Sequence, residues 1–173
     1  MSNKTFIFNS KTINQDEIID LLKGVYEHSP WVPARLFSGK INKKINKEYL
    51  YEKLKMIVDH ASKTEKLNLI RSHPELGNKL QKLNKLTKFS KEEQKSAGLD
   101  QCNEDEFEIL TYLNKQYRVQ FEFPFIVAVK GLSKDDIIRE MKKRVDSNKE
   151  EEFETAMKEI HKIAKLRIYD LNY

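Results

Sequence analysis

The sequence predicts an all-α fold, a single compact domain of about seven to eight helices that covers residues 1–173. Its length suits one domain with one substantial core. With only five Gly and four Pro, the chain has few residues suited to the tight turns of a many-stranded sheet. Apolar residues recur at helical spacing along most of the chain, and several of these stretches begin with residues that cap helices.

In the first half of the chain, the periodicity predicts a helix over residues 14–28. The segment 28–33 contains two prolines, which break helices, and should interrupt it. Further helices are expected at about 47–62 and 64–72. Pro74 is then expected in the first turn of another helix, where the missing N–H has no cost.

In the second half, three Ser or Asn residues are followed three positions later by an acidic residue, which is the pattern of a capping box. They are Ser90 with Glu93, Asn103 with Glu106, and Ser133 with Asp136. Each predicts the start of a helix, the last running to about residue 146. A final helix is expected at about 149–171, and the apolar run 121–130 should form a buried, non-helical segment around Pro124.

Composition argues against several classes of protein. The net charge of +5 comes from 32 basic and 27 acidic residues that alternate along the chain, whereas a nucleic-acid-binding protein concentrates basic residues on one face. The single Cys102 cannot form an internal disulfide, which favours a reducing compartment. No membrane span or targeting signal is evident, so the cytoplasm is the expected location.

Among chemical motifs, the chain has no P-loop, no glycine-rich dinucleotide turn and no Cys/His cluster at metal-ligand spacing. Acid/base chemistry therefore remains, and His73 is the strongest candidate. It stands between two predicted helices and is followed by Pro74, and the pKa of histidine suits proton transfer near neutral pH. The alternative is that His73 only ends the preceding helix.

Three polar residues near the predicted helix start at Ser90 form a second candidate. A capping box explains Ser90 and Glu93 without any function. The amino end of a helix also attracts anions, however, so a carboxylate substrate could bind there, and the amide of Gln94 can both donate and accept hydrogen bonds. By default, the aromatic run 121–129 is core and Arg167 is a solvated charge.

Taken together, five blocks along the chain resemble one family. They are His-Ser-Pro-Trp-Val at 28–32, Arg-Ser-His-Pro-Glu-Leu at 71–76, Ser-x-x-Glu-Gln at 90–94 followed by Ala-Gly-Leu at 97–99, the stretch from Leu113-Asn114 through Tyr117 to Phe-x-Phe-Pro-Phe-Ile at 121–126, and Leu-Arg-Ile at 166–168. Their content and order are similar to those of the 2-oxo-4-hydroxy-4-carboxy-5-ureidoimidazoline (OHCU) decarboxylases, which form (S)-allantoin late in urate oxidation. Each block alone is weak, but five in order are specific.

The resemblance implies an all-α homodimer that acts on a small ureido-imidazoline substrate and needs no metal or organic cofactor. It implies that His73 is the catalytic acid/base and that Glu93 acts with it. The residues implied to bind the substrate are Pro74, Ser90, Gln94, Phe125, Ile126, Val127 and Arg167.

One departure concerns Glu122, which stands where the family commonly has Gly. If that position needs a positive φ, Glu122 is strained there; alternatively, it is an exposed bend. Two other functions remain open. One is a non-catalytic helical binding module, and the other is a decarboxylase of the same fold that acts on a related ureide.

Overall fold

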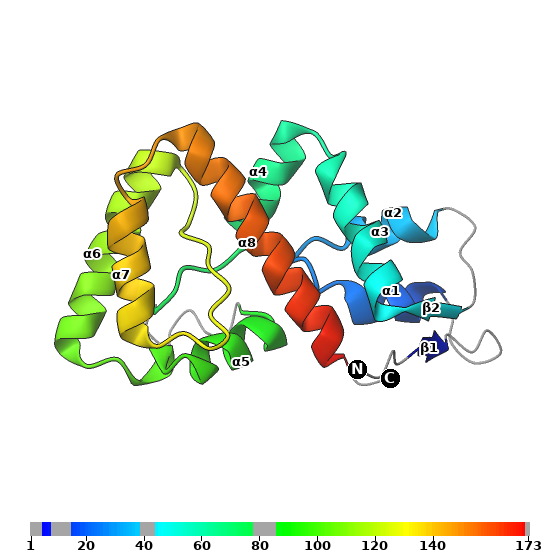
Figure 1. Ribbon diagram of the computed structural model, residues 1–173, viewed down its shortest axis with the longest axis horizontal. Coiled ribbons are helices and arrows are strands. Elements are labelled where there is room, and N and C mark those ends of the chain that lie inside the picture. The colour runs from blue at the N-terminus through cyan, green and yellow to red at the C-terminus, as the bar shows by residue number, and fades with distance from the viewer. Residues whose placement is uncertain (1–4, 8–14, 39–43, 78–85, 172–173) are drawn as a thin grey trace. The chain divides into compact units, whose positions relative to one another are not determined.

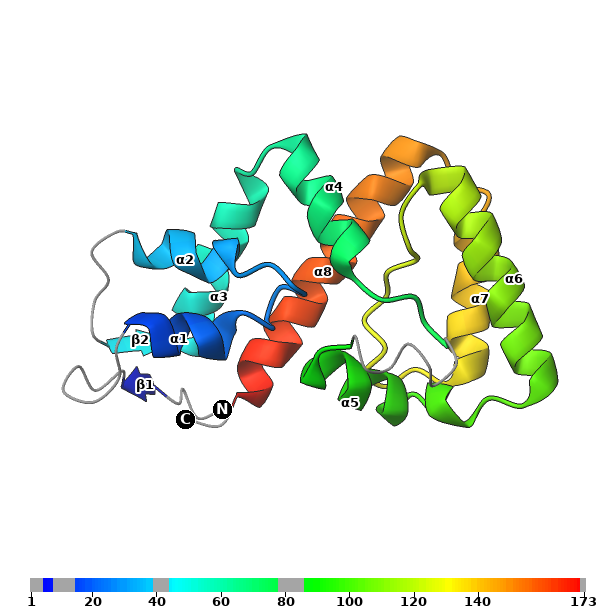
Figure 2. The ribbon, with the colours of Figure 1, turned by 180° about the vertical axis from the view of Figure 1, so that it is seen from behind.

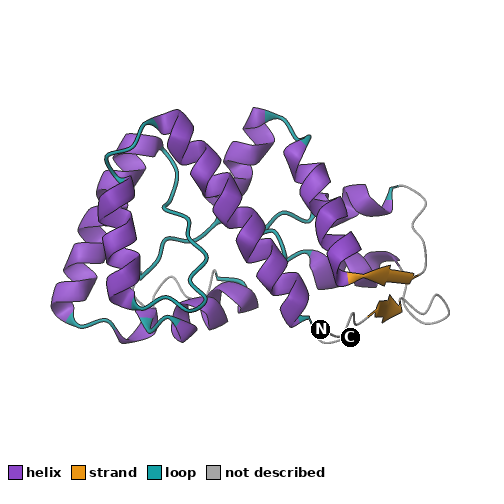
Figure 3. Ribbon diagram, in the orientation of Figure 1, coloured by secondary structure: helices purple, strands orange, loops and turns teal. Residues whose placement is uncertain are grey.

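The computed structural model describes residues 5–7, 15–38, 44–77 and 86–171. This part of the chain is mainly helical, which confirms the predicted all-α class (Figures 1 and 3). It contains the helices α1 (Gln15–Leu22), α2 (Trp31–Phe37), α3 (Lys47–Asp59), α4 (Lys63–Ser72), α5 (Lys88–Ser96), α6 (Glu104–Phe121), α7 (Lys134–Arg144) and α8 (Lys149–Asp170), the 3-10 turn η2 (Leu99–Gln101) and the strands β1 (Thr5–Ile7) and β2 (Lys44–Asn46). The strands form a short antiparallel pair that the sequence did not predict.

The chain divides into two compact units. The first comprises Met1–Leu69 and His161–Tyr173, and the second comprises Ile70–Ile160. The boundaries fall inside α4 and α8, so each of these helices contributes residues to both units. The single domain expected over residues 1–173 stays a prediction.

The first unit is built around apolar side chains of α1, α3 and the end of α8. The buried members of this set include Ile18, Leu22, Leu50, Leu54, Val58, Ala164 and Ile168. Asn46 begins α3 by accepting a hydrogen bond of 2.7 Å from the backbone N–H of Tyr49, which satisfies one of the donors that a helix start leaves open.

In the second unit, α6 and α7 lie side by side, as both views show (Figures 1 and 2). The predicted capping boxes at Asn103 and Ser133 are both present, each with reciprocal side-chain and backbone hydrogen bonds. On α6, the ring of Tyr117 lies 4.5 Å from that of Phe121 and 5.3 Å from that of Phe125, measured between centroids. These rings form the centre of the unit's core.

Two predictions in the first unit were wrong. The helix expected over 14–28 ends at Leu22 and gives way to turns before Gly24, a residue of low helix propensity. The segment 28–33 does more than interrupt a helix, because α2 begins inside it at Trp31. Pro33 occupies the first turn of α2, where a missing N–H costs no hydrogen bond.

Candidate active site

His73 lies directly after the last residue of α4. Its backbone N–H donates to the carbonyl of Ile70 at 3.1 Å, and its side chain is buried, with 7% of the residue exposed. Pro74 disfavours helical backbone at the residue before it, which explains why α4 ends here. Pro74 itself is not in a helix, so that prediction was wrong: residues 73–75 are irregular and 76–77 form a turn.

Side chains from two helices hold the turn that follows His73. The backbone N–H of Gly77 donates to Gln94 Oε1 of α5 at 3.2 Å, and the Asn114 side chain of α6 donates to the carbonyl of Leu76 at 2.9 Å. Gly77 has a φ of +71°, and a Cβ there would lie 2.5 Å from Leu110 Cδ1. Any other residue would be strained by this φ and would displace the Leu110 side chain, so the position favours glycine, while the two hydrogen bonds restrain the backbone after His73.

Helix α5 carries the Ser90, Glu93 and Gln94 candidates. Its N-cap is Thr87, whose hydroxyl accepts from the backbone N–H of Ser90 at 3.2 Å, so Ser90 lies inside the first turn. The predicted capping box that starts at Ser90 was wrong. The pattern of Ser90 and Glu93 failed as a signal for the helix start because Thr87, three residues before Ser90, already accepts from the backbone N–H of Ser90.

The three candidates of α5 share one side of the helix. Ser90 and Gln94, four residues apart, are both buried, and Glu93 is partly buried. Besides binding Gly77, the Gln94 side chain donates to the carbonyl of Glu75 at 3.5 Å, a long contact. Gln94 therefore links the Ser90 block directly to the His73 block.

The third block follows α6 and is joined to the first. Arg71, two residues before His73, donates through Nε to the carbonyl of Glu122 at 3.1 Å. Glu122 has a φ of +64° and is exposed, and the chain then runs without regular secondary structure through the buried residues Phe125 and Ile126. The structure thus brings three of the five sequence blocks together within the second unit.

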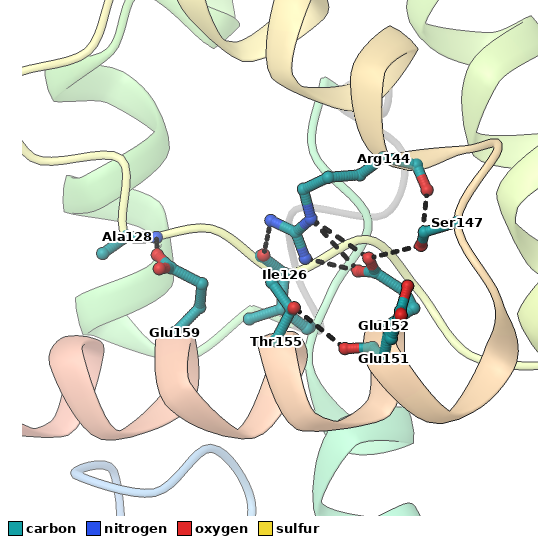
Figure 4. Close-up of polar contacts among 8 residues, drawn as sticks. All are labelled: Ile126, Ala128, Arg144, Ser147, Glu151, Glu152, Thr155 and Glu159. Atoms are coloured by element: carbon teal, nitrogen blue, oxygen red, sulfur yellow. Dashed lines mark hydrogen bonds and ion pairs between the residues drawn. The ribbon is translucent and has the colours of Figure 1, made fainter.

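A buried guanidinium of the second unit contacts this irregular segment (Figure 4). Arg144, the last residue of α7, donates through Nη1 to the carbonyl of Ile126 at 2.9 Å and forms an ion pair with Glu152 of α8. Burial and the neighbouring carboxylate of Glu159 raise the pKa of Glu152 above its ordinary value. The donation from Arg144 to both carboxylate oxygens opposes that shift.

Arg167 belongs to the first unit, where it is a buried ion-pair partner. Its Nη1 lies 2.7 Å from Glu27 Oε2 and donates to the carbonyl of Gly24 at 2.8 Å. Only 2% of the residue is exposed, so the solvated charge taken as the default is wrong. Its role as a substrate ligand stays a prediction.

Several of these polar residues were missed in the sequence. Arg144 follows Ile137 and Met141 at intervals of four and three, which is the spacing of a buried helix face, and this signal could have identified it. Glu27 and Glu152 have no comparable signal, because an acidic residue in an amphipathic stretch is usually solvated.

Within residues 5–7, 15–38, 44–77 and 86–171, no group of three or more His, Cys, Asp or Glu side chains could hold a metal ion. No helix there combines the length and apolar character needed to cross a membrane.

Comparisons with known proteins point in one direction. Residues 11–169 match the family model described as OHCU decarboxylase. A uric acid degradation bifunctional protein of Bacillus sp. (strain TB-90) is 41% identical over 159 residues, which is 92% of this chain but only 30% of that protein. A 2-oxo-4-hydroxy-4-carboxy-5-ureidoimidazoline decarboxylase of Haloferax volcanii is 38% identical over 156 residues, covering 90% of this chain and 89% of that protein.

Solved structures agree with these relatives. The crystal structure of (S)-allantoin synthase has a TM-score of 0.69 and 30% identity, and the match covers 91% of this chain and 50% of that one. The crystal structure of an OHCU decarboxylase in the presence of (S)-allantoin has a TM-score of 0.68 over 86% of this chain and 94% of the other. At 20% identity, the second likeness speaks for the fold alone.

Proposed function

This chain belongs to the OHCU decarboxylase family, and we propose that it decarboxylates 2-oxo-4-hydroxy-4-carboxy-5-ureidoimidazoline to (S)-allantoin, the last step of urate oxidation in purine breakdown. The observation that carries the proposal is the constrained turn that holds the buried His73. Gln94 and Asn114 bind its backbone from two helices, and both residues lie in blocks that resemble the family. Relatives of this name that match along almost their whole length support the same activity.

The substrate supplies its own electron sink in this reaction. Loss of CO2 breaks a bond to the ring carbon that bears the hydroxyl, and the electron pair moves into the adjacent C=N bond, whose nitrogen takes up a proton. No cofactor is needed to accept the electrons. The resulting enol becomes a carbonyl when its hydroxyl loses a proton and the neighbouring ring carbon gains one. That last proton creates the stereocentre, so the site must deliver it to one face of the ring.

Within this scheme, His73 handles the proton of the hydroxyl and Glu93 orients His73 or the substrate. Ser90 lies within the first turn of α5, so its side chain, rather than a capping role, is the group proposed for the substrate. Gln94 would bind the substrate while its amide supports the turn after His73.

The remaining ligands come from three places in the chain. Pro74 would line the pocket, and the segment Phe125–Val127 would offer backbone groups to the heterocycle. Ile126 lies in this segment, with its carbonyl already bound by Arg144. Arg167 would meet a carbonyl or carboxylate oxygen of the substrate, a task suited to its planar guanidinium.

The first prediction tests His73. In a coupled assay that starts from urate, with urate oxidase and hydroxyisourate hydrolase supplied, the wild-type protein should produce the circular dichroism signal of (S)-allantoin. His73→Ala should fold and lower the rate about 100-fold or more, because positioned general acid/base groups contribute on that scale. Glu93→Gln should also slow turnover.

His60→Ala is the matched control. His60 is exposed at the end of α3, and its ring lies 2.8 Å from the carbonyl of Met56 on the same helix, so its loss should leave the rate unchanged. Full optical signal from His73→Ala at the wild-type rate would rule out the proposed role of His73.

We also propose that the chain acts as a homodimer in the cytoplasm. The resemblance to the family supports the dimer, and the lone Cys102 supports a reducing compartment. Neither property enters the chemical argument, because every residue assigned to the reaction belongs to one chain: the turn, α5 and the segment Phe125–Val127 lie in the second unit, and Arg167 lies in the first.

A further inference from the structure

The segment Phe125–Ala128 lacks regular secondary structure, yet one buried side chain contacts two of its residues in succession. The guanidinium carbon of Arg144 lies 4.4 Å from the centroid of the Phe125 ring. Its Nη1 also donates to the carbonyl of Ile126 at 2.9 Å, a bond drawn in Figure 4. Stacking fixes the ring and the hydrogen bond fixes the peptide that follows it. Arg144 therefore restrains both the side chain and the backbone at this point.

Glu152 in turn holds Arg144 in place. Arg144 Nε lies 3.2 Å and 3.3 Å from the two carboxylate oxygens, and Nη2 donates to Oε1 as well. The side chains are 8% and 1% exposed, and Ser147 donates to Oε2 at 3.2 Å. Because desolvation makes a buried ion pair no more stabilising than a well-packed apolar pair, stability alone gives little reason for it.

A second carboxylate restrains the other end of the segment. The backbone N–H of Ala128 donates to Glu159 Oε2 of α8 at 2.9 Å (Figure 4). Val127 thus lies between two anchored peptide groups. Among the residues that the structure describes, no hydrogen bond binds its own N–H or C=O, and these are backbone groups that the proposed function assigns to the heterocycle.

We propose that Arg144, held by Glu152, is a positioning residue that fixes the backbone of Phe125–Val127 for the decarboxylation. This inference rests on the proposed function. Arg144 acts indirectly: it holds the peptide groups of this segment in place, and these peptide groups would orient the ring of the substrate. A displacement of about 1 Å in such a contact can cost on the order of 100-fold in rate.

Two variants separate positioning from folding. In the double variant Arg144→Met with Glu152→Leu, an apolar pair replaces the ion pair, an exchange that other proteins tolerate without loss of stability, but the Ile126 carbonyl loses its donor. Arg144→Lys keeps the charge without the planar fork. Arg139→Met is the control, because Arg139 lies on the same helix and its recorded partner among the described residues is Asp136, at the exposed surface.

The coupled assay should give a kcat about 10- to 100-fold lower for the double variant, with a KM changed less than kcat and a lower enantiomeric purity of allantoin. Arg144→Lys should recover part of the loss, and Arg139→Met should match the wild type. Hydrogen exchange measured by mass spectrometry should be faster for peptides that cover residues 125–129 in the two Arg144 variants, and unchanged in the control.

A folded double variant with wild-type kcat, KM, enantiomeric purity and exchange would overturn the proposal. If the double variant does not fold, the same four measurements on Arg144→Lys decide it. Absence of turnover in the wild-type protein would instead contradict the proposed function, whereas unchanged exchange would contradict the restraint by Arg144. The two failures are therefore distinguishable.

Discussion

Glu122 is a residue at which the chain departs from the family's motif, and its backbone is left-handed. Its φ of +64° and ψ of 19° lie in the left-handed region, where a Cβ costs about 1–2 kcal/mol. Both interpretations offered by the sequence hold, because the residue has a positive φ and is also exposed. Its carboxylate pairs with Lys149 at 2.5 Å, which lowers the pKa of Glu122.

A pair of substitutions measures this strain. Glu122→Gly and Glu122→Ala both remove the ion pair with Lys149, but only alanine keeps a Cβ. We expect the glycine variant to be more stable than the alanine variant by about 1 kcal/mol in urea unfolding. Equal free energies of unfolding would show that the left-handed backbone has no measurable cost here.

The residue at which helix α5 begins determines which of its polar side chains caps the helix and which can make other contacts. With Thr87 as the N-cap, the Ser90 hydroxyl is not needed to begin the helix, and Ser90 and Gln94 share one buried face. Gln94 then ties this helix to the turn that carries His73. The contact between Gln94 and Gly77 thus joins two sequence blocks across 17 residues of the chain.

Substitutions at Thr87 test where α5 begins. Thr87→Ala should lower the free energy of unfolding by about 1 kcal/mol, because the N–H of Ser90 loses its acceptor. Thr87→Ser keeps the hydroxyl and should retain most of that stability. Thermal melts of both variants give the comparison, and an Ala variant as stable as the Ser variant would argue against this cap.

At the scale of the whole molecule, one buried histidine should contribute to how stability depends on pH. His161 lies between Tyr26 and Asp59 in the first unit, with Nδ1 2.9 Å from the Tyr26 hydroxyl and Nε2 3.0 Å from Asp59 Oδ1. An ionised Asp59 requires the proton on Nε2, which leaves Nδ1 to accept from the tyrosine. Burial lowers the pKa of His161 despite the opposing effect of Asp59, so the neutral ring is favoured in the folded protein.

The pH dependence follows from the sign of that shift. The unfolded chain takes up a proton on His161 near pH 6.5, whereas the folded protein does so only at lower pH. The stability that the folded protein gains from the neutral ring of His161 is therefore complete above pH 6.5. It declines as the pH falls towards the pKa of His161 in the folded protein. Relative to His161→Gln, which does not titrate, the wild-type protein should lose stability between pH 7.5 and pH 5. A difference in free energy of unfolding that stays constant over this range would contradict the prediction.

The amino-acid sequence by itself determined the helical class, most helix positions in the second half of the chain and the blocks that identify the family. These properties depend on residues close together along the chain: apolar spacing, and caps such as Asn103 with Glu106 and Ser133 with Asp136. Local chemistry also identified His73 and Ser90 as candidates, and the order of the blocks related both to one family.

Only the tertiary structure decided which buried polar groups meet. The Gln94 contact with Gly77, the Arg144 contacts with Ile126 and Glu152, and the position of Arg167 beside Glu27 join different elements of the fold. A charged residue in an amphipathic stretch has the same local pattern whether it is solvated or buried. Its environment depends on which segments pack against it, and that is a property of the folded chain, because a buried charge is tolerated only where distant residues supply its partners.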